Sequence, residues 1–60
     1  MGEPKFEVFT DKGGEFRFRL KAPNGEVIAV SESYTTKEAC FNGIESVKRN
    51  APVAHVVESE

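Results

Sequence analysis

Two glycine-containing tripeptides divide the first half of the chain, and they constrain its fold more than any other feature. Lys12-Gly13-Gly14 and Pro23-Asn24-Gly25 separate three strand-like runs at residues 5–11, 15–22 and 26–31. The first two runs alternate apolar and polar side chains, which is the pattern of a half-buried strand. Short loops that contain glycine join antiparallel neighbours. The first half of the chain is therefore predicted to form a three-stranded antiparallel meander.

The length of the second loop follows from the residues that it would bring together. A two-residue loop would pair Arg19 with Val30 and so place a charge opposite a predicted core residue. A three-residue loop pairs Leu20 with Ile28 and Phe18 with Val30 instead. Proline suits the first position of a type I turn, and glycine suits the left-handed position that follows. We therefore predict a three-residue loop.

The same rule, applied to the first loop, pairs Val8 with Phe18 and Phe6 with Leu20. A slip of one residue would turn every apolar side chain to the other face of the sheet, so the pattern fixes the register. One face of the predicted sheet then carries the apolar residues Phe6, Val8, Phe16, Phe18, Leu20, Ile28 and Val30.

The second half of the chain predicts one helix and a last strand. Thr35 and Glu38 have the spacing of a capping box at a helix start, and Asn50 followed by Pro52 marks its end. Residues 53–57 then have the character of a fourth strand. The apolar residues that recur at helical spacing are Cys40, Ile44 and Val47. The predicted fold class is α+β, a β-β-β-α-β unit with the helix packed on one face of the sheet.

The chain has 60 residues, which is one domain at most, with an ordered core expected at residues 5–57. A domain of this size buries only about 60% of the surface that its unfolded chain exposes. The gain from that burial roughly cancels the entropy of ordering the chain. The single cysteine, Cys40, cannot form a disulfide within the chain, and no Cys/His cluster has zinc-site spacing. We therefore expect a second copy of the chain to supply the missing core.

Composition argues against several classes of protein. No run of residues has the length of a membrane span, and residues 1–5 lack the apolar stretch of a signal peptide. The expected compartment is the reducing cytoplasm, with no membrane partner. No acid/base pair, metal-binding set or activated nucleophile can be assembled, so we expect neither an enzyme nor a cofactor. The net charge of −2 does not favour nucleic acid.

One basic stripe nevertheless qualifies as a candidate site. Arg17, Arg19 and Lys21 alternate along the second predicted strand, and Phe9 lies on its neighbour as a stacking surface. These residues favour weak binding of nucleic acid or phosphate. The alternative is an ordinary solvated sheet face, because the register places Glu7 opposite Arg19, where the two side chains can form an ion pair.

Tyr34 and Phe41 flank the predicted start of the helix and form a second candidate site. They can edge a groove that takes a peptide or a small ligand at a dimer seam, or they can complete the core. Cys40 lies on the apolar stripe of the helix and is interpreted as a buried, inert thiol. His55 has no second imidazole or paired nucleophile and is interpreted as an interface residue of the last strand.

Several segments together resemble the YegP-like family of small bacterial proteins. They are FEVF at 6–9, GEFRFRLKA at 14–22, NGEVIA at 24–29, SYT at 33–35 and CFNGIESVKRNAP at 40–52. The resemblance implies a β-β-β-α-β unit that occurs in tandem in one chain or as single units that dimerise. It also implies one continuous sheet with exchanged C-terminal strands. This chain holds one unit, so the resemblance implies a homodimer.

The predicted dimer interface is the last strand, with Val53, His55, Val56 and Val57. The connector at residues 50–52 leaves open whether that strand returns to its own sheet or joins the partner's. The resemblance brings no activity and no catalytic residues. The predicted role is a non-catalytic, homodimeric structural or interaction module. The alternatives are weak nucleic-acid binding and ligand or peptide binding at the dimer seam.

Overall fold

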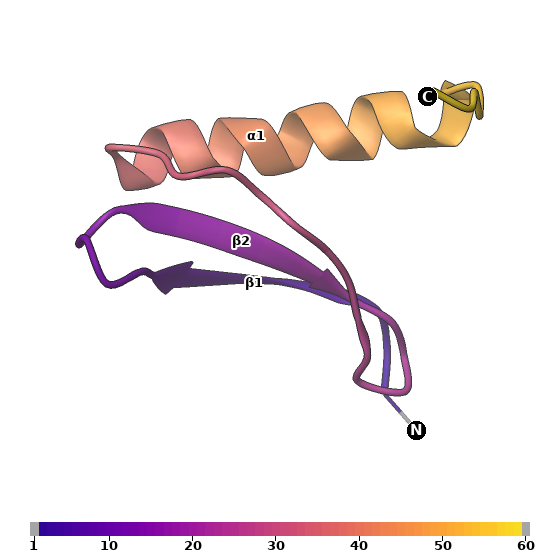
Figure 1. Cartoon of the computed structure of the whole chain (residues 1–60). Helices are drawn as coiled ribbons and strands as arrows, with labels where there is room; N and C mark the ends of the chain where they lie inside the picture. The colour runs from indigo at the N-terminus through magenta and orange to yellow at the C-terminus, as the bar shows by residue number, and fades with distance from the viewer. Residues whose placement is uncertain (1, 60) are drawn as a thin grey trace.

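A computed structural model describes residues 2–59 of the chain. Three antiparallel strands, β1 (Lys5–Thr10), β2 (Phe16–Lys21) and β3 (Val27–Val30), form one sheet in the order β1-β2-β3. The helix α1 (Lys37–Asn50) lies across one face of this sheet (Figure 1). A short 3₁₀ turn, η1 (Ala51–Val53), follows it. The α+β class, the three-stranded meander and the position of the helix are confirmed.

The first hairpin has the predicted turn and register. The Asp11 amide donates to the Glu15 carbonyl at 2.9 Å, which closes the loop over Lys12-Gly13-Gly14. Gly14 has φ +81°, a left-handed conformation that favours glycine. Val8 lies opposite Phe18 and Phe6 opposite Leu20, as the alternation predicts.

The second hairpin has the predicted turn but a different register. The Ala22 amide donates to the Glu26 carbonyl at 2.8 Å, and Gly25 has φ +91°, so the loop has three residues. A β-bulge follows at once, because Lys21 lies opposite Val27 whereas Leu20 lies opposite Ala29. The predicted pairs of Leu20 with Ile28 and of Phe18 with Val30 are wrong.

The bulge removes two residues from the predicted core. Ile28 is the extra residue and is 61% exposed, and Val30 lies opposite Arg19 and is 50% exposed. The chain beyond β3 explains the shifted register, because Ser31 is held to β2 from both directions. Its amide donates to the Phe18 carbonyl at 2.8 Å, and its hydroxyl accepts from the Phe18 amide at 2.9 Å.

Both ends of the helix differ by one residue from their predicted positions. The N-cap is Thr36, whose hydroxyl accepts from the Ala39 amide at 3.0 Å, so the capping box of Thr35 with Glu38 is wrong. Asn50 remains helical, and its side-chain amide turns back and donates to the Ser46 carbonyl at 2.8 Å. The C-cap is Ala51.

The core is small and lies between α1 and β2. Its three buried residues are Phe18, Cys40 and Ile44. The predicted apolar stripe of the helix is confirmed, since Cys40 and Ile44 are buried and Val47 is partly buried. The partly buried residues that pack against this core are Phe6, Val8, Phe16, Tyr34 and Val47.

The predicted fourth strand is not formed in the single chain. Val53 belongs to η1, and residues 54–59 carry no strand. Val53, Val56 and Val57 are 74%, 97% and 81% exposed. This segment leaves α1 at the end away from the β1–β2 turn and has no strand beside it with which to pair (Figure 1).

Candidate functional site

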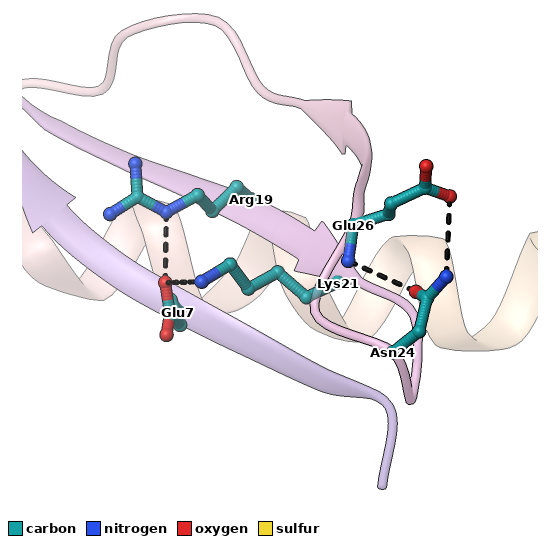
Figure 2. Close-up of polar contacts among 5 residues, drawn as sticks. All are labelled: Glu7, Arg19, Lys21, Asn24 and Glu26. Atoms are coloured by element: carbon teal, nitrogen blue, oxygen red, sulfur yellow. Dashed lines mark hydrogen bonds and ion pairs between the residues drawn. The ribbon is translucent and has the colours of Figure 1, made fainter. Parts of the chain in front are cut away.

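The three cations of the basic stripe share one face of β2, and each has a partner within the chain. The Arg17 guanidinium donates to the Ser31 carbonyl through Nε at 3.0 Å and Nη2 at 2.8 Å. Arg19 Nε and Lys21 Nζ lie 2.8 and 3.5 Å from the same Oε1 atom of Glu7 (Figure 2). The predicted cross-strand ion pair between Glu7 and Arg19 is therefore present.

The charged side chains on this face interact with one another and with Phe9. The hydrogen bond from Arg19 lowers the pKa of the Glu7 carboxyl below its ordinary value, although desolvation opposes it. The Arg19 guanidinium also covers the Phe9 ring at 4.3 Å from the centroid. The ring predicted as a stacking surface, Phe9, is thus covered by Arg19. The side chains of Arg17, Arg19 and Lys21 are bound to Ser31 and Glu7 of the same chain. This arrangement favours the solvated-face interpretation.

The Asp11 carboxylate organises a corner that the sequence reasoning missed. Its Oδ1 accepts from the amides of Gly13 at 2.9 Å and Glu15 at 3.0 Å, and its Oδ2 accepts from the Ser33 hydroxyl at 2.9 Å. These hydrogen bonds, first of all that from Glu15, lower the pKa of Asp11. The sequence carries a signal for this corner, because an aspartate just before a glycine-containing turn often accepts hydrogen bonds from the backbone of that turn. The corner joins the β1–β2 turn to the segment before α1.

Among residues 2–59, neither the Cys40 thiol nor the His55 imidazole takes part in a hydrogen bond or an ion pair. Cys40 is fully buried, and burial raises the pKa of its thiol, which disfavours the reactive thiolate. His55 lies in the exposed C-terminal segment. Within residues 2–59 no group of three metal-binding side chains comes together. Over the same residues, no helix is long and apolar enough to cross a membrane.

Two apolar grooves flank the helix, one along each edge of the sheet. The β1 groove, of about 340 Å³, lies beside the first half of α1. The β3 groove, of about 330 Å³, lies beside the second half, and Leu20, Ala29, Val30, Glu32 and Tyr34 are among its lining residues. The residues that line the β1 groove are Val8, Phe9, Thr10, Phe16, Lys37 and Phe41.

Tyr34 and Phe41 line different grooves of the single chain, and a groove that both share at a dimer seam stays a prediction. Phe41 lines the β1 groove and is 50% exposed. Tyr34 lines the β3 groove and stacks on Phe18, with ring centroids 6.3 Å apart. Tyr34 thus completes the core, whereas Phe41 presents an apolar surface to solvent.

A family model described as a domain of unknown function, DUF1508, matches residues 11–58. The chain belongs to the DUF1508 family. A UPF0339 protein of Treponema denticola is 65% identical over 54 residues, 90% of this chain and 93% of the relative. An NMR solution structure of a protein from Haloferax volcanii is similar with a TM-score of 0.89 and 47% identity, over 98% of this chain and all of that one.

One of the relatives is longer than this chain. A UPF0339 protein encoded in the ptx operon 5' region of Stutzerimonas stutzeri is 64% identical over 47 residues, which are 78% of this chain but 42% of the relative. These matches confirm the resemblance to the small YegP-like family. The family description assigns no activity.

Proposed function

We propose that this DUF1508 chain is a non-catalytic, homodimeric interaction module in which the C-terminal segment of each copy covers apolar surface of the other. The carrying observation is the pattern of exposed apolar residues. At the C-terminal end of the chain, Val53, Val56 and Val57 are each at least 74% exposed, and the sheet and helix expose further large apolar side chains. Those further residues are Val27, Ile28, Val30 and Phe41.

The exposed area supports the same proposal. The chain exposes 4969 Å². A compact folded monomer of 6.6 kDa exposes about 3,900 Å². The excess of roughly 1,100 Å² is more than the roughly 800 Å² that each partner buries in a standard interface. Much of the apolar part of this exposed area belongs to Val27, Ile28, Val30, Phe41 and the valines of the C-terminal segment, and large exposed apolar side chains of this kind are typical of interaction surfaces.

The edges of the sheet give a second chain a means of attachment. In an antiparallel sheet of order β1-β2-β3, each outer strand keeps one row of backbone groups unpaired. A partner's extended segment can pair with such a row, and its alternate side chains can then fill the adjoining groove. The double-length relative is consistent with this proposal, because two copies of the present chain would supply a similar length of sequence.

The mass in solution tests the proposal directly. Sedimentation equilibrium or light scattering is expected to give twice the 6.6 kDa mass of one chain. Dilution should then yield the single chain in a reversible step, as expected for association by mass action. A mass of one chain at every concentration would overturn the proposal.

A further inference from the structure

Two lysines, Lys5 and Lys21, lie directly opposite one another at the start of the β1–β2 ladder. Like charges in opposite positions of an antiparallel pair repel each other and destabilise the sheet. One carboxylate on the same face, that of Glu7, offsets part of this charge, and its Oε1 atom lies 2.8 Å from Arg19 Nε and 3.5 Å from Lys21 Nζ. This end of the face therefore holds three cations and one carboxylate, in a chain whose net charge is −2.

These cations lie on the face of the sheet that is turned away from α1. Successive residues of a strand alternate between the two faces, and Phe18 packs on the helix side, so Arg19 and Lys21 lie on the other side. Figure 2 shows Glu7, Arg19 and Lys21 together, with the helix on the far side of the sheet. Lys5 is exposed, and the side chains of Arg19 and Lys21 are 36% and 27% exposed. A ligand in solution can therefore reach all three cations.

The Arg19 side chain is held in place and still has donors to offer. Its Nε is bound to Glu7, and its guanidinium carbon lies 4.3 Å from the centroid of the Phe9 ring. Within residues 2–59, the hydrogen bond to Glu7 is the only one that this guanidinium makes. A guanidinium presents its donors in a fixed fork that fits phosphate oxygens. The contacts within this face therefore orient Arg19 for an anion and reduce the entropy that binding costs.

The other end of the basic stripe carries no such surplus of charge. The Arg17 guanidinium donates to the Ser31 carbonyl through two of its nitrogens, and the Asp11 carboxylate interacts with it. We infer that the patch formed by Lys5, Arg19 and Lys21 binds the backbone phosphates of single-stranded nucleic acid. This inference goes beyond the proposed function and does not depend on it, because these three cations are not among the exposed apolar residues that a second copy would cover.

The charge and the shape of the patch favour this ligand. Three cations against one carboxylate leave two positive charges, which two successive phosphodiester groups neutralise. Alternate residues of a strand lie about 7 Å apart, so Arg19 and Lys21 can follow an extended backbone along β2. An open sheet face suits a single strand, whereas a duplex is read by an element that enters a groove. An anionic membrane would also face the rest of this negatively charged chain, whereas a single strand contacts the patch alone.

Fluorescence anisotropy of a labelled oligothymidine, titrated at several salt concentrations, tests this inference. The unaltered chain should bind at low salt, and log Kd should rise with log salt concentration with a slope of about 1.4, the value for two neutralised phosphates of a single strand. Lys5→Gln should raise the Kd roughly fivefold at low salt and reduce the slope by about 0.7. This substitution leaves the fold intact, because it removes the repulsion between Lys5 and Lys21.

Two further variants separate the patch from the total charge of the chain. Glu7→Gln keeps an oxygen that accepts from Arg19 but removes the opposing charge, so it should lower the Kd roughly fivefold at low salt. Such a gain in affinity cannot come from a loss of fold. The matched control is Lys48→Gln, which makes the same charge change as Lys5→Gln but on α1, at the other face of the sheet. It should leave the Kd within about twofold of the original value.

Amide chemical shifts give a second readout, which locates the ligand on the molecule. Addition of oligothymidine should shift the amide signals of Lys5, Glu7, Arg19 and Lys21, and shifts confined to α1 would overturn the inference.

Three results of the titrations would also overturn it. The first is no binding of the unaltered chain at low salt, and the second is an equal loss from Lys5→Gln and Lys48→Gln. The third is a preference for another ligand, either a duplex over the single strand or vesicles of anionic phospholipid over oligothymidine. None of these readouts is the mass in solution, so the failure of this inference is distinguishable from the failure of the proposed function.

Discussion

Gly43 of α1 lies close to the side chains of Tyr34 and Phe18. A Cβ atom added there would lie 2.5 Å from the Tyr34 hydroxyl oxygen and 3.3 Å from Cε2 of Phe18. Alanine would raise helix propensity by about 1 kcal/mol, but overpacking a core contact costs about 1–3 kcal/mol. Gly43→Ala is therefore expected to lower the free energy of unfolding by about 1 kcal/mol, measured by urea denaturation.

Two companion variants separate packing from propensity at this point in the helix. Asn42→Ala, at an exposed neighbouring position, should stabilise the chain by a few tenths of a kcal/mol. Tyr34→Phe removes the oxygen nearest to the added methyl group, so in the Gly43→Ala background it should recover part of the loss. An equal gain from both alanine substitutions would show that helix and sheet have room to spare.

Asp11 makes part of the stability depend on pH. Its pKa is lowered from 3.8 in the folded chain by the hydrogen bonds from Glu15 and Ser33. Because the pKa of Asp11 is lower in the folded chain than in the unfolded chain, the ionised carboxylate stabilises the fold. This stabilisation is fully present above the pKa of the unfolded chain and is lost as the pH falls through the pKa of the folded chain. Asp11→Asn should therefore lower the melting temperature at pH 7, and the difference from the unaltered chain should narrow below pH 3.8.

The Ser33 hydroxyl provides the control for this pH dependence. Ser33→Ala removes one of the donors that favour the ionised Asp11 carboxylate, while the two backbone donors remain. In the Ser33→Ala background, the effect of Asp11→Asn on the melting temperature should therefore depend less on pH than it does in the unaltered chain. If the melting temperatures of Asp11→Asn and the unaltered chain differed by the same amount at every acidic pH, ionisation of Asp11 would not contribute to stability.

At the scale of the element, the start of α1 separates two adjacent threonines. Thr36 accepts from the Ala39 amide, whereas Thr35 lies one residue before the cap. Thr36→Ala should therefore cost about 1 kcal/mol of unfolding free energy, and Thr35→Ala only a few tenths. Thermal and urea denaturation of the two variants measure the difference. Equal losses would contradict the assignment of the cap.

The same pair of residues shows what local patterns can and cannot predict. The spacing of Thr35 and Glu38 is that of a capping box, yet a second threonine offered the chain an alternative one residue later. The energies of the two starts differ too little for spacing to choose between them. By contrast, Cys40 and Ile44 were predicted correctly as core, because helical periodicity over several turns is a strong signal.

The register of β3 was predicted wrongly because it, too, depends on a choice that the local pattern does not determine. The three-residue turn was predicted correctly from Pro23-Asn24-Gly25, but the bulge at Ile28 was not. A bulge adds one residue that the apolar–polar alternation does not reveal, and the two hydrogen bonds between Ser31 and Phe18 fix the shifted register. Arg19 can lie opposite Val30 because Val30 is half exposed and does not belong to the core that the alternation predicts.

At the scale of the whole molecule, the candidate site was predictable only in part. The shared face of Arg17, Arg19 and Lys21 followed from strand alternation, and the ion pair of Arg19 with Glu7 followed from the register. The separation of Tyr34 and Phe41 into two grooves did not, because it depends on how α1 crosses the sheet. No local sequence pattern encodes that crossing.

A homodimer should unfold at a temperature that depends on its concentration. Two chains of 60 residues have an unfolding entropy of about 250 cal/mol/K. A tenfold rise in concentration contributes about 1.4 kcal/mol, so the melting temperature should rise by about 5 °C. One chain that carries two copies joined by a flexible linker should lose this dependence, because its partner is always present. Calorimetry of both proteins at two concentrations makes the comparison, and identical melting temperatures for the unlinked chain would contradict the dimer.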